Sequence, residues 1–162
     1  MEAFGRVAEI MVTVVLIFLC PLYYMAQKQD MLCQTYLTGS TTYFVDSIRN
    51  TGKVTRDMYE TFLNELYFTG MHFDILLTCY EPYVLWDGEE PVKKYRIVDQ
   101  TELIEQLYQE EACFFQAGDY IQIHIRNRTP SLGMKLRNTF LGTDYYGETS
   151  VRYGGTIRNE TG

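Results

Sequence analysis

The chain has 162 residues, enough for one domain with an appendage, and its apolar content of 46% is typical of a folded protein. Its net charge of −7 argues against binding to nucleic acid, because phosphate backbones are neutralised by clustered lysine and arginine. It contains 14 tyrosines and 9 phenylalanines, and aromatic side chains favour half-buried β-surfaces.

The first predicted element is an apolar helix near the start of the chain. Ile10 to Ala26 contains no charged residue and is close to the minimum length of a membrane-spanning helix. Tyr23 and Tyr24 stand near its end, where aromatic side chains meet the lipid–water boundary. Pro21 predicts a bend, because proline removes one backbone donor and clashes with the preceding turn. We expect a retained, single-pass membrane anchor.

Three alternatives to a retained anchor stay open. Cleavage of a secretory signal after Ala26 would place bulky Tyr24 three residues before the cut, where a small residue is preferred. A lipoprotein would use Cys20, which follows Leu19 rather than a small residue. A short apolar run also suits a buried core helix. The flanking cations Arg6 and Lys28 favour a cytoplasmic N-terminus and an exported remainder.

The helical pattern continues beyond the anchor. Apolar residues at spacings of three, four and seven predict one helix from about residue 7 to residue 49. Thr38–Thr42 interrupts this pattern with weak helix formers, and Gly52 suits the position just after a helix end. The sequence therefore divides into an anchor at residues 1–30 and an extracytoplasmic head at residues 31–162, with the stalk helix at residues 31–49.

A second helix is predicted over residues 56–69. Thr55 suits its N-cap, Asp57 favours its N-terminal dipole, and Gly70 follows its end. Its apolar positions form one stripe that we expect to face the core: Met58, Tyr59, Phe62, Leu63, Leu66 and Tyr67.

The rest of the head alternates between strands and short helices. Period-two patterns predict strands at residues 73–85, 93–98, 121–126 and 151–158. Trp86–Pro91 reads as a turn, and Gly154-Gly155 suggests a bulge in the last strand. Asp99 with Glu102 predicts a helix start, whereas residues 131–141 are ambiguous between helix and irregular structure.

These elements predict an α+β fold. A long N-terminal helix, transmembrane and then stalk, would pack on a small antiparallel sheet with one or two further helices.

No residue pattern predicts a cofactor, a metal site or an enzyme. His72 and His124 have no partner at ligand spacing, and Asp87–Glu90 lacks the alternating ligands of a calcium loop. The sequence contains no G-x-G-x-x-G, phosphate loop or G-x-S-x-G. Asn127 and Asn159 begin sequons, which matter only in a glycosylating pathway.

The cysteines leave two interpretations open. Cys79 and Cys113 are candidates for a disulfide if the head is exported, although spacing alone does not establish it. Buried free thiols are the alternative.

The order of anchor, stalk and α+β head resembles type IV pilin-like proteins, and more closely the TadE-like pseudopilins of Gram-positive bacteria. The resemblance is carried by Gly5 and Glu9 at the head of the apolar helix and by Pro21 within it. "VDSIRNTGKVTRDMYETFLNEL", "GDYIQIHI" and "YGGTIRNE" are similar to the segments that follow the anchor in those proteins. Cleavage after Gly5 would leave Glu9 at position four, whereas the family has glutamate at position five.

This resemblance implies a structural role, with Gly5, Glu9 and Pro21 as candidates for processing or assembly. The expected function is a pseudopilin-like subunit or assembly factor of a cell-envelope pilus or secretion system. Its partners would be the membrane, other pilin-like or machinery subunits, and possible further copies of itself. The alternative is a membrane-tethered extracytoplasmic binding module, and an enzyme of unrecognised type is a third candidate.

Overall fold

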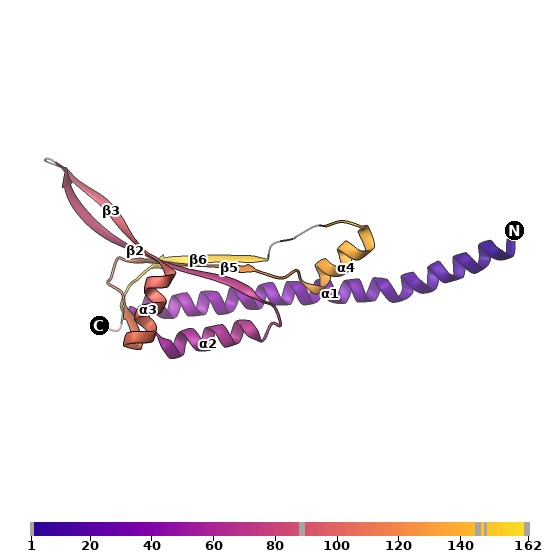
Figure 1. Ribbon diagram of the computed structural model, residues 1–162, viewed down its shortest axis with the longest axis horizontal. Helices are drawn as coiled ribbons and strands as arrows, with labels where there is room; N and C mark the ends of the chain where they lie inside the picture. Colours follow the sequence, from indigo (N-terminus) through magenta and orange to yellow (C-terminus); the bar gives the residue numbers. More distant parts are fainter. Residues whose placement is uncertain (1, 88–89, 145–146, 148, 161–162) are drawn as a thin grey trace. The chain divides into compact units, whose positions relative to one another are not determined.

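The computed structural model describes residues 2–87, 90–144, 147 and 149–160, and it confirms the predicted α+β class (Figure 1). Its helices are α1 (Glu2–Thr51), α2 (Arg56–Tyr67), α3 (Gln100–Glu110) and α4 (Leu132–Leu141). Its strands are β1 (Lys53–Thr55), β2 (Phe73–Asp87), β3 (Glu90–Val98), β4 (Ala112–Phe114), β5 (Tyr120–Asn127) and β6 (Ser150–Thr156).

The chain forms two compact units, and α1 contributes to both. The first unit comprises Met1–Thr35 and Pro130–Gly147, and the second comprises Tyr36–Thr129 and Glu148–Gly162. These units differ in two respects from the anchor at residues 1–30 and the head at residues 31–162 that the sequence predicts. Along α1 the boundary falls between Thr35 and Tyr36 rather than after residue 30. The segment around α4 belongs with the first part of α1 rather than with the sheet.

Helix α1 is longer than the pattern predicts and runs through the interruption that weak helix formers suggest. It includes Pro21, and it also continues through Thr38–Thr42. Within that stretch the Thr41 side chain is fully buried, and its hydroxyl donates to the Leu37 carbonyl at 2.6 Å. Core burial and this local hydrogen bond offset the weak helix propensity of threonine. The helix ends as predicted at Gly52, which has φ +66° and donates to the Ile48 carbonyl.

The main sheet of the second unit is antiparallel, with strand order β3-β2-β5-β6. Odd-numbered residues of β5, and of β2 as far as Cys79, face the core, so Ile121, Ile123 and Ile125 are fully buried as their alternation predicts. The second part of α1 and α2 lie together on one side of this sheet (Figure 1). Polar residues such as His124 and Gln122 fall on the other face.

One hydrophobic core joins these layers. Its largest contributors are buried residues of α1, α2, α3 and the sheet: Leu37, Phe44, Val45, Ile48, Tyr59, Phe62, Leu66, Leu77, Leu103, Leu107, Ile121, Ile123 and Ile125. The predicted α2 stripe is confirmed for Tyr59, Phe62 and Leu66, and Thr55 caps that helix by accepting from the Met58 amide. Tyr67 is the exception, because 66% of it is exposed.

The structure also contains a two-stranded sheet that the sequence patterns do not predict. Strands β1 and β4 pair antiparallel with Val54 opposite Cys113, and each has only three residues. Alternation cannot be read over so short a run. The pairing is extended by backbone bonds from Phe115 to Gly52 and from Arg56 to Glu111. It ties the end of α1 to the end of α3.

The expected bulge at Gly154-Gly155 is wrong. Strand β6 pairs with β5 residue for residue, with Gly154 opposite Gln122 and Gly155 opposite Ile121. Both glycines are explained by close neighbours. A Cβ at Gly154 would meet the Ile121 carbonyl oxygen at 2.6 Å, and one at Gly155 would overlap the guanidinium of Arg49 from α1.

In the first unit, α4 resolves the ambiguous segment at residues 131–141 as a helix. Ser131 is its N-cap and accepts from the Met134 amide at 3.2 Å. The same hydroxyl donates to the Asp30 carboxylate of α1 at 2.6 Å. Gly142, with φ +60°, follows its last turn. Helix α4 thus has a capping serine at its start and a glycine in the left-handed conformation at its end.

Candidate functional site

The first candidate surface is the apolar part of α1. An 18-residue window of this helix has a mean hydropathy of 2.1, and none of it is buried against the described residues. Its exposed side chains include Ile10, Leu16, Ile17, Phe18 and Leu22. They point outward all around the helix rather than along one stripe. By length and composition this helix could span a membrane.

The three residues singled out by the family resemblance lie within α1. A Cβ at Gly5 would meet no atom within 4 Å, so the glycine is not required by a contact among the described residues. Glu9 is exposed, and its backbone carbonyl accepts from the Thr13 hydroxyl at 2.8 Å. Its carboxylate makes no hydrogen bond or ion pair within the described chain. Pro21 is exposed on the same helix.

The end of the apolar segment carries the aromatic and basic groups typical of a lipid–water boundary. The Tyr23 hydroxyl accepts from Gln27 Nε2 at 2.8 Å, and the Lys28 ammonium lies 5.3 Å from the centre of the Tyr24 ring. Tyrosine and lysine side chains can place an apolar body beside lipid and a polar tip in water.

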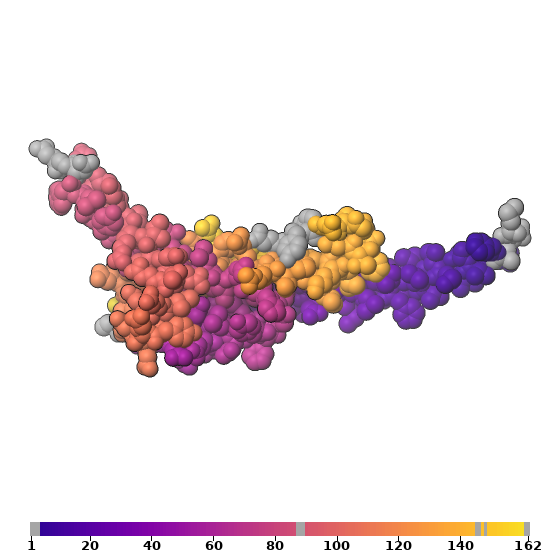
Figure 2. Space-filling model, in the orientation of Figure 1, coloured from indigo at the N-terminus to yellow at the C-terminus, as the bar shows by residue number. Residues whose placement is uncertain are grey.

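The second candidate surface is the hairpin of β2 and β3. Strand β2 pairs with β5 only from Phe73 to Tyr80, whereas its pairing with β3 runs from Cys79 to Asp87. Beyond Tyr80 the hairpin is therefore a two-stranded ribbon that leaves the sheet. We call residues 80–87 and 90–97 the arm. Figure 2 shows it projecting from the rest of its unit. The expected turn at Trp86–Pro91 is shorter, because both end residues belong to strands.

One face of the arm is almost wholly apolar. Opposed residues of an antiparallel pair share a face, and alternate residues return to it. The resulting apolar face consists of Tyr80, Pro82, Val84, Trp86, Pro91, Tyr95 and Ile97, with Lys93 as its single charge. Trp86 is 73% exposed and Ile97 is 62% exposed. Contiguous exposed apolar surface of this kind marks contact with a partner or a membrane.

Ion pairs brace the opposite face of the arm at its base. Arg96 lies 2.7 Å from the Glu102 carboxylate of α3 and 3.6 Å from that of Glu81 across the hairpin. Isolated hairpins are marginally stable in water, so this connection to α3 helps to hold the arm in place.

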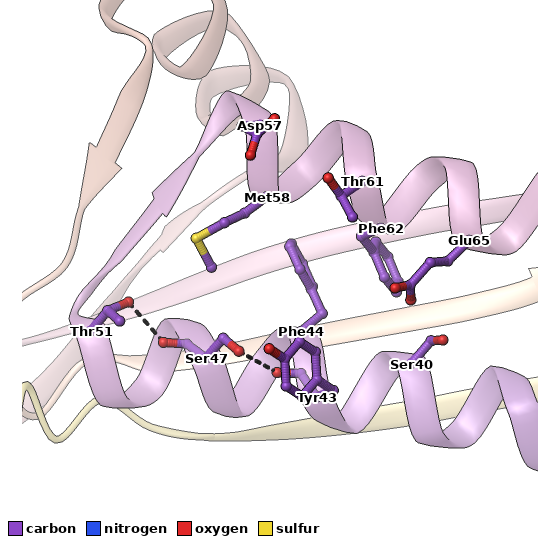
Figure 3. A pocket seen from close by; sticks show the side chains of 10 residues that line it. All are labelled: Ser40, Tyr43, Phe44, Ser47, Thr51, Asp57, Met58, Thr61, Phe62 and Glu65. Atoms are coloured by element: carbon purple, nitrogen blue, oxygen red, sulfur yellow. Dashed lines mark hydrogen bonds between the residues drawn. The ribbon is translucent and has the colours of Figure 1, made fainter.

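A groove between α1 and α2 is one of the hollows in the second unit (Figure 3). It has a volume of about 380 Å³, and its floor includes the stacked rings of Phe44 and Phe62, with centroids 4.3 Å apart. The Ser47 and Thr51 hydroxyls donate back to carbonyls of their own helix. Among the described residues that line the groove there is no lysine, arginine, histidine or cysteine, and its charged side chains are Asp57 and Glu65. Its described lining therefore holds no positive charge that would attract a phosphate group.

Both candidate disulfide cysteines are buried free thiols in this structure. Burial, reinforced by Asp119 and Glu81, raises the pKa of the Cys79 thiol to about 12. Burial and Glu110 also raise the pKa of Cys113, whose Sγ donates to the Leu103 carbonyl at 3.3 Å. These protonated thiols are poor nucleophiles and poor metal ligands.

The remaining polar candidates have structural roles or stand apart. Within the described residues no three His, Cys, Asp or Glu side chains gather as a metal site. The Asp87–Glu90 turn lies partly outside the described residues. The Asn127 side chain donates to the Thr129 carbonyl and accepts from the Thr149 amide. Both polar atoms of this sequon asparagine are therefore engaged in hydrogen bonds to the backbone.

No known protein family, curated protein or solved structure matches this chain. Sequence reasoning identified the apolar helix but missed the arm, because alternation in β2 does not reveal where pairing with β5 stops. The Pro-Tyr-Val-Leu-Trp stretch before Asp87 was the available signal, since it places bulky groups on both faces of one strand.

Proposed function

We propose that this protein is a pilin-like structural subunit or assembly factor of a cell-envelope pilus or secretion system. The observation that supports this proposal is that the exposure of apolar side chains on α1 changes along the helix. The helix is apolar and exposed around Ile10–Leu22, and then supplies fully buried Leu37, Val45 and Ile48 to the head. One helix thus has the surface of a membrane anchor and the surface of a core helix. The α+β head built on it fits the order expected for such subunits.

Glu9 is the residue through which subunits would recognise each other. At the centre of a bilayer its carboxylate would cost about 2.5–3.5 kcal/mol, but at the leading edge of the apolar run it can reach the interface. Its carboxylate makes no ion pair within the described chain. In an assembly a neighbouring N-terminal ammonium would supply that pair, and reduced exposure to water would strengthen it.

The first test replaces this carboxylate. Glu9→Ala should lower the amount of protein released into a sheared surface fraction at least severalfold, while total membrane-bound protein stays constant. Glu110→Ala, which removes an exposed carboxylate at the end of α3, is the matched control and should leave the yield unchanged. Mass spectrometry of the N-terminus would show in parallel whether cleavage occurs near Gly5. Normal assembly of the Glu9→Ala protein would contradict the proposed role.

A second candidate function rests on the arm. A membrane-tethered binding module would present the apolar face of the arm to a different protein or a glycan. Photocrosslinking from position 86 separates the two candidates. Adducts at multiples of the chain's own mass favour a subunit that assembles, whereas a single adduct with another molecule favours the binding module.

A further inference from the structure

Helix α4 is fixed to α1 at the end of the apolar segment. The Ser131 hydroxyl joins the α4 N-terminus to Asp30, and Gly133 lies against Asp30 and Ala26. A side chain at Gly133 would overlap the Asp30 carboxylate, and Ala26 is only 2% exposed beneath this contact. Two buried small residues and one hydrogen bond thus set the level of α4 along α1. That level is the predicted lipid–water boundary, next to Tyr24 and Lys28.

The rest of α4 presents apolar side chains to solvent. Leu132 and Phe140 are 58% and 46% exposed, whereas Leu136 between them is half-buried. Leu141 in the last turn is 63% exposed. From its attachment α4 leans toward the N-terminal side of α1 (Figure 1). Its exposed apolar end therefore points toward the segment that would lie in lipid.

The charges of α4 have the sign that suits a membrane surface. Lys135 and Arg137 lie within it, and residues 130–143 contain no aspartate or glutamate. The whole chain carries −7, so this cationic stretch runs against the overall charge. Helices that lie in the interface combine basic residues with exposed leucine and phenylalanine in this way.

From these observations we infer that α4 is an interfacial helix that inserts its exposed Leu132, Phe140 and Leu141 side chains into the membrane surface around the anchor. The occupant of its apolar face is the lipid–water boundary of an anionic bilayer. Lys135 meets phospholipid phosphates there, while Ser131 and Gly133 fix the helix to Asp30. The inference rests on the proposed membrane insertion of α1. It adds a second contact, formed by a segment far away in sequence, that would set the depth of the anchor.

Lipid quenching in the full-length chain tests this position. In a Trp86→Phe background, a single tryptophan is placed at Phe140→Trp, at Val15→Trp in the apolar segment, or at Phe114→Trp on β4, where the native ring is 76% exposed. Each protein is reconstituted into phosphatidylcholine vesicles with or without phosphatidylglycerol. Brominated lipids should quench the tryptophans at positions 15 and 140 and shift their emission to the blue. The tryptophan at position 114 should stay unquenched.

The outcomes separate the two proposals. Quenching at position 15 without quenching at position 140 would overturn the interfacial role of α4 and leave the anchor intact, and a protein partner on α4 would give this result. Quenching at position 140 without quenching at position 15 would show that α4 meets lipid, but it would overturn the anchor and with it the role of α4 in setting the depth of the anchor. Lack of quenching at both positions would overturn both.

A separate substitution tests how the Lys135 charge contributes to the contact with anionic lipid. In the Phe140→Trp protein, Lys135→Glu should reduce the extra quenching that phosphatidylglycerol produces and leave the signal in phosphatidylcholine unchanged. Lys93→Glu on the arm makes the same charge change and should have no effect. Equal responses to the two substitutions would contradict a specific role for the Lys135 charge.

Discussion

Gly154 shows how a single position in β6 is set by the strand beside it. Its would-be Cβ lies 2.6 Å from the Ile121 carbonyl oxygen and 3.1 Å from the Gln122 Cα, and both are backbone atoms of β5. Backbone in a paired strand cannot move aside without breaking the register. The Tyr120 hydroxyl, 3.0 Å from the same point, fills the space that the missing side chain leaves.

We expect Gly154→Ala to destabilise the second unit by about 2 kcal/mol, the usual effect of forced overpacking. Urea unfolding followed by circular dichroism measures it. Gly39→Ala is the control, because a Cβ there meets no atom within 4 Å in the middle of α1. That substitution should stabilise the helix by about 0.5–1 kcal/mol. Equal effects at the two glycines would contradict the explanation.

The Cys79 thiol makes stability depend on pH above the neutral range. Its folded pKa of about 12 lies above the ordinary value of 9.0, so the folded state holds this proton more tightly than the unfolded state. The resulting stability is complete below pH 9 and is lost as the pH rises toward 12. In Cys79→Ala the decline in unfolding free energy between these values should be shallower.

Alkylation reports the state of the same thiols. Native Cys79 and Cys113 should resist iodoacetamide at pH 8 and react fully in urea, because burial keeps both protonated and shielded. A disulfide between them, the alternative that the sequence raises, would leave both unreactive in urea until a reductant is added. Peptide mass spectrometry distinguishes these results.

At the scale of elements, the arm is a ribbon without a core of its own. Its strands are paired with each other but with no third strand beyond Tyr80, and all of its described β3 residues are exposed up to Ile97. Its side chains therefore add little to the stability of the fold. Exposed Trp86 and Tyr95 are better explained by contacts made outside the chain.

Removing the apolar groups of the arm should separate stability from association. Trp86→Ala with Tyr95→Ala should change the unfolding free energy by less than about 0.5 kcal/mol, as is usual for exposed positions. The amount of photocrosslinked or assembled protein should fall severalfold. Phe68→Ala, at a ring that is 87% exposed at the end of α2, is the control and should leave association intact. Loss of folding in the arm variant would show that the arm supports the core.

At the scale of the whole molecule, the apolar part of α1 is not covered by the head core, and the residues of the head core are buried without it. The core begins at Leu37 on α1, and Ala26 is the first buried residue of the described helix. A chain without residues 1–25 should therefore fold and stay soluble without detergent, with the thermal midpoint of the full-length protein. Aggregation of that chain, with its core unfolded, would support the alternative that the segment is a core helix.

The sequence by itself determined the local features of this protein. Thr55 and Asp99 cap their helices, Gly52 ends α1, and the isoleucines of β5 alternate into the core, because each signal depends on neighbours a few residues away. The apolar character of the first helix is likewise a property of composition. These signals were sufficient for the α+β class and for most element boundaries.

Only the tertiary structure decided features that depend on distant residues. The β1–β4 pair, the point where β2 leaves β5, and the docking of Ser131 on Asp30 join segments that are remote in sequence. The need for glycine at position 154 comes from the β5 backbone, not from local turn chemistry. Such contacts are fixed by register and close approach between elements, and periodicity within one element carries no information about them.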